Sequence, residues 1–226
     1  MGRIRQWRQE EAEAFFKEAQ SLLAAGGILA VPTDTYYALA AHPFNEEALT
    51  RLFALKQRPG GKPILLLVAS QEMVSQVARE VPEVGRRLMA RFWPGPLTII
   101  LPARPELPQL VTGGTGTVGV RQPRHAITCD LVAALGCPVT GTSANRAGQP
   151  PLTRATEVEE QFGEEVDLIL DAGPCPGGQP STVVDVSCTP PRLVRAGATP
   201  TAGLVELIPK IQQLREGRPG WPKNRW

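Results

Sequence analysis

Short apolar runs alternate with segments of helical periodicity along most of the chain, and this alternation restricts the possible folds most strongly. Apolar residues recur at helical spacing over 12–23, and the apolar run 28–31 that follows is ended by Pro32. Several connections between such runs are shorter than a parallel crossover requires, so the pattern predicts a single α/β domain with a mixed sheet. Further strands are expected at 64–69, 97–101, 118–121, 138–140, 166–171, 182–186 and 193–195, and further helices at 45–55, 71–79, 83–92, 126–135, 153–162 and 201–214.

The predicted domain spans residues 8–200, because the composition does not change before that point. A C-terminal helix is expected over 201–214 and a basic, flexible tail over 215–226. No apolar run approaches the roughly 20 residues that a membrane helix needs, and no apolar signal core opens the chain. A membrane protein or a secreted protein is therefore not expected.

Charge and cysteine usage narrow the class of protein further. The 226 residues include 24 basic and 22 acidic ones, and only 5% are aromatic, which does not predict an extended nucleic-acid surface or a stacking platform. The four cysteines form no Cys-x-x-Cys pair and there are two histidines, so no metal site is predicted. Reduced thiols are typical of a cytoplasmic protein, which is the expected localisation.

The segment 56–63 gathers three cations, Lys56, Arg58 and Lys62, in a loop shaped by proline and glycine. The expected strand 64–69 follows directly, and loops at the ends of core strands often carry the binding residues of α/β proteins. Such a cluster can neutralise a polyanion such as a triphosphate. A solvated basic turn explains the same residues, and the segment alone does not separate the two.

Hydroxyl groups and further arginines also fall at the ends of predicted strands. A turn, a helix cap or an ordinary surface salt bridge would explain any one of them alone. Strand ends of an open α/β sheet can nevertheless converge on one crevice. A crevice with cations and hydroxyls but no nucleophile–base pair suits the positioning and electrostatic stabilisation of a phosphate reaction. The residues at these strand ends are Thr33, Lys56, Arg58, Arg121, Ser143, Ser181 and Arg195.

The segment 114–119 fits the pattern G-x-G-x-x-G, but it does not predict a dinucleotide-binding fold. That fingerprint follows a strand and opens a helix, whereas here the glycines lead into the expected strand 118–121. A glycine-rich entry to a strand could instead expose backbone N–H groups to phosphate oxygens.

Seven motifs occur in order between about residues 10 and 200. They are Pro32-Thr-Asp-Thr-x-Tyr37, Lys56-x-Arg-Pro…Lys62-Pro, Trp93-Pro-Gly-Pro-Leu-Thr98, Val118-x-Val-Arg121-x-Pro, Ser143-Ala-Asn145, Ser181-Thr-Val-Val-Asp185 and Leu193-Val-Arg-x-Gly197. In identity and order they resemble the YrdC/Sua5 family, the L-threonylcarbamoyladenylate synthases. Because the last motif lies near the end of the chain, the resemblance is to the short, YrdC-type form.

The resemblance implies a twisted mixed sheet with flanking helices, the YrdC-like and DHBP-synthase-like fold, around a basic concave cavity. It implies condensation of L-threonine, bicarbonate (or CO2) and ATP to L-threonylcarbamoyl-AMP and pyrophosphate, with Mg²⁺ accompanying ATP and no prosthetic group. The product would serve the t6A modification at position 37 of tRNAs that read ANN codons, through a downstream threonylcarbamoyl transferase complex. Binding of tRNA or RNA in the basic cavity stays open.

The resemblance also assigns roles to individual residues. The L-threonine site would comprise Thr33, Arg121 and Ser181. The catalytic cations that face the triphosphate would be Lys56, Arg58 and Lys62. The ATP site would comprise Lys56, Arg58, Thr117, Ser143, Asn145 and Arg195.

Three positions depart from the usual family pattern. Tyr36 replaces a valine, Ala38 replaces a glycine, and Ala147 stands where serine is common. The ending Tyr-Ala-Leu resembles the YciO-like paralogues, so a YciO-like protein is one alternative. A non-catalytic RNA-binding protein with the same fold is another, and a carbamoyl-adenylate enzyme like the YrdC-like part of hydrogenase-maturation proteins is a third.

Overall fold

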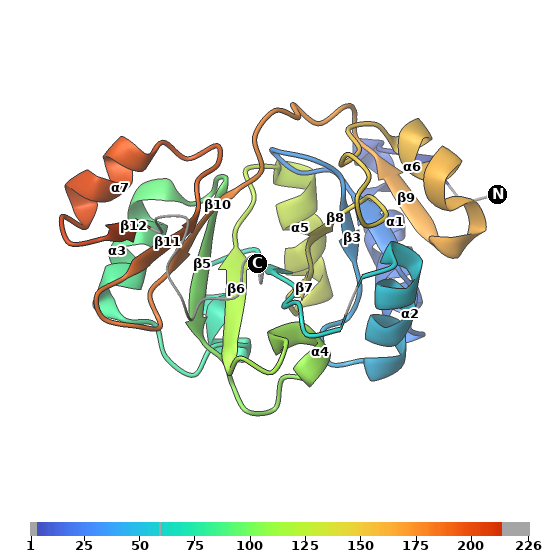
Figure 1. Ribbon diagram of the computed structural model, residues 1–226. Coiled ribbons are helices and arrows are strands. Elements are labelled where there is room, and N and C mark those ends of the chain that lie inside the picture. Colours follow the sequence, from blue (N-terminus) through green and yellow to red (C-terminus); the bar gives the residue numbers. More distant parts are fainter. Residues whose placement is uncertain (1–3, 59, 214–226) are drawn as a thin grey trace.

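The computed structural model describes residues 4–58 and 60–213, and within them it confirms a mixed α/β fold. The strands form two mixed sheets rather than the single sheet expected, and these stand side by side with helices around them (Figure 1). The predicted tail 215–226 lies outside the described residues. The helices are α1 (Ala12–Ala24), α2 (Glu46–Lys56), α3 (Glu83–Phe92), α4 (Gln109–Thr112), α5 (Ala126–Leu135), α6 (Ala155–Phe162) and α7 (Thr201–Leu207), with short 3-10 turns at Gln9–Glu11, Glu72–Gln76 and Gly163–Glu165.

The five-stranded sheet has the order β1-β9-β2-β3-β8. Its central strands are buried on both faces, as their almost wholly apolar sequences require. Alternate residues of β2 point to opposite faces: Ala30 packs with α2 and α6, whereas Leu29 and Val31 pack with α1 and α5. The strands are β1 (Ile4–Gln6), β2 (Leu29–Val31), β3 (Ala38–Ala40), β8 (Thr142–Ser143) and β9 (Leu168–Asp171).

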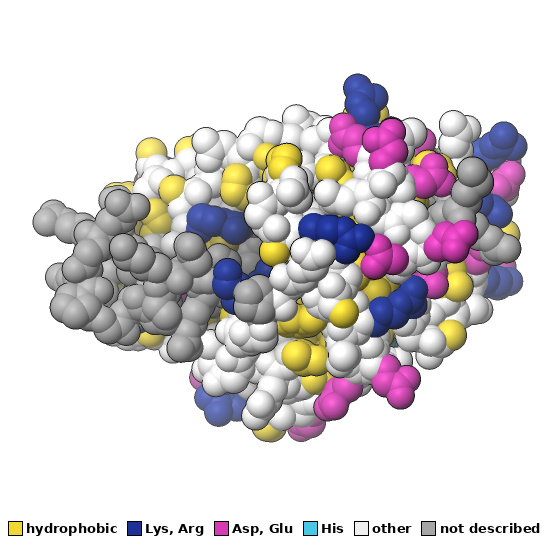
Figure 2. All heavy atoms as spheres, turned by 45° about the vertical axis from the view of Figure 1, so that its right-hand side comes forward, with side chains coloured by type: hydrophobic (Ala, Val, Ile, Leu, Met, Phe, Trp, Pro, Cys, Tyr) yellow, Lys and Arg dark blue, Asp and Glu magenta, His cyan; other side chains and the backbone are white. Residues whose placement is uncertain are grey.

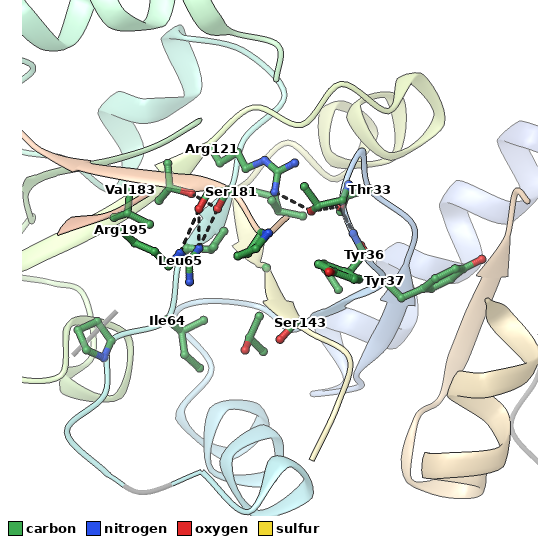
Figure 3. A pocket seen from close by; sticks show the side chains of 18 of the residues that line it. Thr33, Tyr36, Tyr37, Ile64, Leu65, Arg121, Ser143, Ser181, Val183 and Arg195 are labelled. Atoms are coloured by element: carbon green, nitrogen blue, oxygen red, sulfur yellow. Dashed lines mark hydrogen bonds between the residues drawn. The ribbon is translucent and has the colours of Figure 1, made fainter. Parts of the chain in front are cut away.

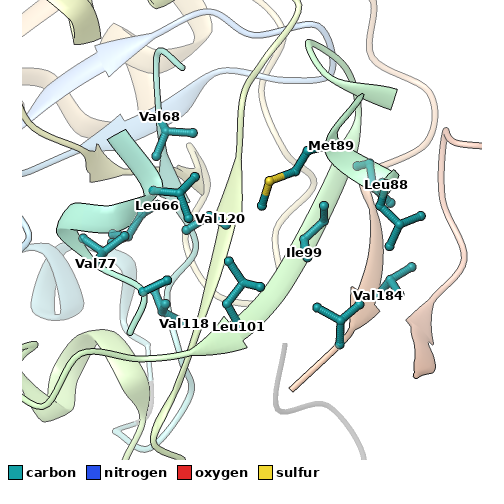
Figure 4. Packing of buried hydrophobic residues seen from close by; sticks show 14 of the residues in the cluster. Leu66, Val68, Val77, Leu88, Met89, Ile99, Leu101, Val118, Val120 and Val184 are labelled. Carbon is teal, nitrogen blue, oxygen red and sulfur yellow. The ribbon is translucent and has the colours of Figure 1, made fainter. Parts of the chain in front are cut away.

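The seven-stranded sheet has the order β12-β11-β10-β5-β6-β4-β7, and its two faces differ in chemistry. On one face Ile99, Val120 and Val184 join a cluster of buried apolar side chains with Leu88 and Met89 of α3 (Figure 4). The alternate residues of the same strands point to the other face, where the candidate site lies. The strands are β4 (Leu66–Leu67), β5 (Leu97–Pro102), β6 (Thr117–Arg121), β7 (Val139–Thr140), β10 (Thr182–Asp185), β11 (Arg192–Arg195) and β12 (Gln212–Gln213).

Gly141 is the point at which the chain passes from one sheet to the other, between β7 and β8. A Cβ atom at this position would lie 2.6 Å from Cγ of Leu67 and 2.8 Å from Cδ1 of Leu65. Only glycine leaves room for this crossing, because real Cβ atoms do not approach other heavy atoms so closely. The crossing brings Ser143 beside the strand end of β3.

Two predicted helices are wrong in part. The expected helix 71–79 is a 3-10 turn, since the chain becomes extended again at Ala78, which forms a bridge with Ala103. The expected helix 201–214 ends at Leu207, because Pro209 cannot continue it, and β12 follows where more helix was expected. The strands β1, β3 and β8 and the one-turn helix α4 were not predicted from the sequence.

Candidate functional site

A cavity of about 150 Å³ lies where the two sheets meet (Figure 3). Six of the ten site residues expected from the sequence line it, and they come from segments far apart in the chain. This convergence of strand ends is the arrangement that the sequence pattern predicted. The six are Thr33, Arg58, Arg121, Ser143, Ser181 and Arg195.

Arg121, the last residue of β6, is 4% exposed and is fixed by three groups. Its Nη2 atom donates to Oδ1 of Asp34 at 2.5 Å, Nη1 to the Thr35 hydroxyl at 3.1 Å, and Nε to the Gly95 carbonyl at 3.1 Å. Burial lowers the pKa of this guanidinium, and Asp34 opposes the shift. Since a guanidinium has five N–H groups, these contacts leave one on each terminal nitrogen for a ligand.

Arg195, the last residue of β11, is held against the residue that precedes β10. Its Nε and Nη2 atoms donate to the Ser181 carbonyl at 3.1 and 2.8 Å, and Nη2 also reaches the Ser181 hydroxyl at 3.1 Å. The hydroxyls of Thr98 and Ser181 are 2.9 Å apart. This close packing needs Gly197, where a Cβ atom would collide with the Pro180 carbonyl. Burial, and then the neighbouring Arg121, lower the pKa of Arg195.

Arg58 adds a third guanidinium to the cavity. It is half-buried, and its Nη2 atom donates to the Pro63 carbonyl at 2.7 Å. Its Nε atom is buried and has no hydrogen-bond partner among the described residues. A buried donor without a partner is costly, so this position fits a ligand that brings an acceptor, such as an anionic oxygen.

The five-stranded sheet contributes the turn that joins β2 to β3. The Thr33 hydroxyl donates to the Tyr36 carbonyl at 2.8 Å and accepts from the Thr35 amide at 3.1 Å. The turn therefore satisfies its own backbone, as one alternative reading of the sequence expected, and it still lines the cavity. Tyr36 points toward the cavity, whereas Tyr37 points away toward β9 (Figure 3).

Lys56 does not line the cavity, although the sequence reading placed it at a triphosphate. It is the last residue of α2 and is 4% exposed. Its Nζ atom donates to the Ser143 carbonyl oxygen and, at 2.7 Å, to the Asn145 carbonyl oxygen. Lys56 therefore holds the Ser143–Asn145 loop in place. Burial, and then Arg58, lower its pKa to about 7.

The geometry of the helix end separates Lys56 from Arg58. Gln57 takes up a left-handed conformation with φ of 51° and ends α2, so the residues on either side of it face different ways. Lys62 and Asn145 also lie outside the lining. Thr117 begins β6, roughly 13 Å along the strand from Arg121 at its other end, and is likewise outside.

Thr35, Tyr36 and Thr98 line the cavity but were not among the expected site residues. Alternation along β5 could have identified Thr98: its neighbours Leu97 and Ile99 belong to the apolar cluster, so its own side chain faces the other way. For Tyr36 the sequence indicated only that the residue departs from the family pattern. Its contact with the cavity depends on the fold of the turn.

The charge of the cavity comes from its arginines, because its lining contains no carboxylate among the described residues. No group of three or more His, Cys, Asp or Glu residues within the described part of the chain is arranged to hold a metal ion. Outside the cavity, dark-blue basic and magenta acidic side chains are interspersed on the right of the face in Figure 2. Arg51, for example, pairs with Asp167 at 2.9 Å.

The chain is similar in sequence to known proteins over most of its length. The family model described as "Telomere recombination", for Sua5, YciO and YrdC proteins, matches residues 21–197. A threonylcarbamoyl-AMP synthase of Pyrococcus abyssi is 38% identical over 210 residues, which make up 93% of this chain and 60% of the relative. The chain thus spans about three fifths of the length of that relative.

Solved structures of Sua5 and YciO proteins also resemble the chain in fold. The crystal structure of P. abyssi Sua5 complexed with L-threonine has a TM-score of 0.88 and 36% identity, and covers 95% of this chain and 62% of its own. The crystal structure of Escherichia coli YciO has a TM-score of 0.80 and 28% identity, and covers 92% of this chain and 100% of its own. The family match extends over most of the chain and includes both walls of the cavity. The chain belongs to the Sua5/YciO/YrdC family.

Proposed function

We propose that the chain condenses L-threonine, CO2 or bicarbonate, and ATP to L-threonylcarbamoyl-AMP and pyrophosphate. The observation that carries the proposal is the convergence of three guanidinium groups with hydroxyls on one small cavity whose described lining holds no carboxylate. Such a cavity attracts anions and offers no nucleophile with a neighbouring base. The relatives named threonylcarbamoyl-AMP synthase, and the Sua5 structure with L-threonine, support this reaction over others that use anions.

The threonine would bind at the deep end of the cavity. Arg121 has one N–H left on each terminal nitrogen, a geometry that suits a bidentate contact with the threonine carboxylate. Asp34 and Thr35 would keep the guanidinium oriented for that contact. Thr33 and Ser181 would place hydroxyls beside the amino acid. Pockets that hold drug-sized molecules have volumes of about 300–1,000 Å³. The cavity volume of about 150 Å³ therefore suits a smaller ligand.

ATP would lie across the open side of the cavity as MgATP, with Mg²⁺ entering as part of the substrate. Arg58, with its unpartnered Nε, and Arg195 are the cavity residues that would contact the phosphates. Ser143 would contact the nucleotide, and Lys56 would hold the Ser143–Asn145 loop in place for it. Direct contacts of Lys62 and Thr117 with ATP stay predictions from the family resemblance.

The proposed chemistry needs no covalent intermediate with the protein. The threonine amine adds to the carbon of CO2 and loses a proton to solvent, which gives a carbamate. A carbamate oxygen then attacks the α-phosphorus of ATP, and the bond to the bridging oxygen breaks with its electrons leaving on pyrophosphate. Fixed guanidinium groups would stabilise the charge that develops on the phosphates, and their burial strengthens the effect.

The product would supply the t6A modification at position 37 of tRNAs that read ANN codons. We place the reaction in the cytoplasm, in agreement with four free cysteines, and expect a downstream threonylcarbamoyl transferase complex to consume the product. No described helix has the length and apolarity to cross a membrane. Binding of tRNA to the chain itself is a separate proposal, which a filter-binding titration with salt would test.

The test is incubation of the purified protein with MgATP, bicarbonate and L-threonine, with pyrophosphate release and mass spectrometry as readouts. We expect threonylcarbamoyl-AMP that depends on both threonine and bicarbonate. Replacing threonine by carbamoyl phosphate in a parallel reaction would detect a carbamoyl-adenylate enzyme. ATP binding without product would contradict the proposal and indicate a YciO-like protein, whereas RNA binding without turnover would indicate an RNA-binding protein.

A further inference from the structure

The connection between β9 and β10, residues 172–180, runs from the five-stranded sheet to the seven-stranded sheet along the top of Figure 1, and its last residue, Pro180, lines the cavity. We call these residues the strap. Its first half is anchored in the interior, where the Cys175 amide donates to the Thr153 carbonyl at 2.8 Å and the Thr33 amide contacts the Cys175 sulfur at 3.4 Å. Its far end is also fixed, because the Ala198 amide donates to the Pro180 carbonyl at 2.8 Å.

The middle of the strap, residues 176–179, is less firmly held. Gly177 and Gly178 have φ values of 70° and 83°, so this part has the backbone freedom of glycine in the left-handed region. Two hydrogen bonds between described residues secure it. The Gly177 amide donates to the Thr35 carbonyl at 2.8 Å, and the Tyr36 hydroxyl donates to the Gly178 carbonyl at 2.5 Å.

We infer that Tyr36 is a positioning residue of the cavity, whose hydroxyl holds the middle of the strap against the β2–β3 turn and so strengthens the binding of a small ligand. Its ring lines the cavity while its hydroxyl reaches the strap, so one side chain joins the wall from the five-stranded sheet to the segment that leads into Ser181. The effect on threonine rests on the proposed function; the effect on the strap does not.

The neighbouring glycine supports this role. A Cβ atom at Gly177 would lie 3.8 Å from Cε1 of Tyr36 and 3.2 Å from Cγ2 of Thr153, so the strap backbone lies directly beside the tyrosine ring. A valine at position 36, the residue that the family pattern usually has, carries no hydroxyl and cannot reach the Gly178 carbonyl. The structure therefore gives the departure at position 36 a physical consequence.

The test compares Tyr36→Phe with Tyr37→Phe, the same substitution at the only other tyrosine. The Tyr37 hydroxyl donates toward the Leu170 and Gly173 carbonyls on the other side of the turn, at the start of the strap. Both variants keep the ring and the volume of the cavity. Hydrogen–deuterium exchange of peptides from the strap, without any ligand, is the first readout, and threonine affinity by calorimetry is the second.

For Tyr36→Phe we expect exchange over 177–179 to be about 5-fold faster, equivalent to about 1 kcal/mol, with little change in thermal stability. Threonine should bind up to about 5-fold more weakly, because the closed strap is populated less. For Tyr37→Phe we expect lower thermal stability and unchanged exchange over 177–179.

Unchanged exchange over 177–179 in Tyr36→Phe would overturn the inference whether or not the protein makes product. Faster hydrogen exchange with unchanged threonine affinity would overturn the part that links the strap to ligand binding. A wild-type protein that binds no threonine would overturn the proposed function, while faster exchange in Tyr36→Phe would still support the role of Tyr36 in holding the strap.

Discussion

The two walls of the cavity are built in different ways. The wall from the seven-stranded sheet places Thr98, Arg121 and Arg195 directly on strands, where the pairing of β5, β6, β10 and β11 fixes their backbone positions. The wall from the five-stranded sheet places Thr33 and Tyr36 on a turn whose polar groups largely bond to one another. Strands therefore supply two of the three guanidinium groups of the cavity, those of Arg121 and Arg195, and the turn supplies shape.

The same contrast appears within one motif. Lys56 and Arg58 are two residues apart, yet the lysine donates to carbonyl oxygens of the protein and the arginine lines the cavity. A lysine offers a compact charge that can be buried beneath a loop, whereas a guanidinium has donors in several directions and can serve protein and ligand together. Cations that are neighbours in the sequence thus act in different parts of the site.

Arg121→Ala should have the largest effect on stability and on ligand binding, because it removes the most buried charge from the wall formed by the seven-stranded sheet. Asp34, whose side chain is 13% exposed, would lose its ion-pair partner, which typically costs about 3–5 kcal/mol of the free energy of unfolding. Threonine affinity should also fall, by about 1.5–3 kcal/mol for a lost charge-assisted contact. Denaturant unfolding and calorimetry measure the two effects.

The control for this prediction is the double variant Arg121→Ala with Asp34→Asn, which removes the unpaired charge. It should recover part of the stability but none of the threonine affinity. Recovery of the affinity as well would show that Arg121 acts only through the fold.

Lys56→Met should destabilise the protein by about 1–3 kcal/mol, because it leaves the buried carbonyls of Ser143 and Asn145 without their donor. ATP affinity should fall with it if the Ser143–Asn145 loop holds the nucleotide. Proteolysis or hydrogen exchange of the loop would report the loosening directly. A stable variant with an unchanged loop would contradict the role of Lys56 in holding the loop, and with it the difference drawn between Lys56 and Arg58.

The pH dependence of stability should carry the signature of Lys56. Its folded-state pKa of about 7 lies below the ordinary value of 10.5, so the folded protein binds fewer protons than the unfolded chain between these values. The contribution of Lys56 to the free energy of unfolding should therefore rise with pH from about 7, with a limiting slope of about 1.4 kcal/mol per pH unit. Chemical denaturation between pH 6.5 and 8.5 should show this slope in wild type and not in Lys56→Met.

Arg195→Lys should have the smallest effect. The charge stays, but a lysine cannot reproduce the fork that holds the Ser181 carbonyl and hydroxyl, so we expect a loss of about 0.5–1.5 kcal/mol in ATP affinity. A fluorescent ATP analogue in competition with ATP would measure it. If the lysine variant binds ATP as wild type does, the fork has no part in nucleotide binding and the charge alone suffices.

Much of the fold could be read from the sequence where local rules act. The apolar periodicity predicted most of the helices, and α2 begins within the range expected for it, where Oδ1 of Asn45 caps the helix by accepting from the Ala48 amide at 2.9 Å. The strands β3 and β8 were missed because they are two or three residues long and are defined by their partners. Segments this short cannot show the alternation of apolar and polar residues that identifies a strand.

Local sequence patterns specify the α/β class, the family motifs and the placement of polar residues at strand ends, because these depend on periodicity and on the chemistry of residues close together in the chain. Contacts between distant segments specify that the strands divide into two sheets and that Lys56 lies beneath a loop while Arg58 lines the cavity. They also specify that Tyr36 reaches the strap. These outcomes depend on packing and hydrogen bonds between distant segments, such as Tyr36 and Gly178, which are 142 residues apart, and no local pattern specifies them.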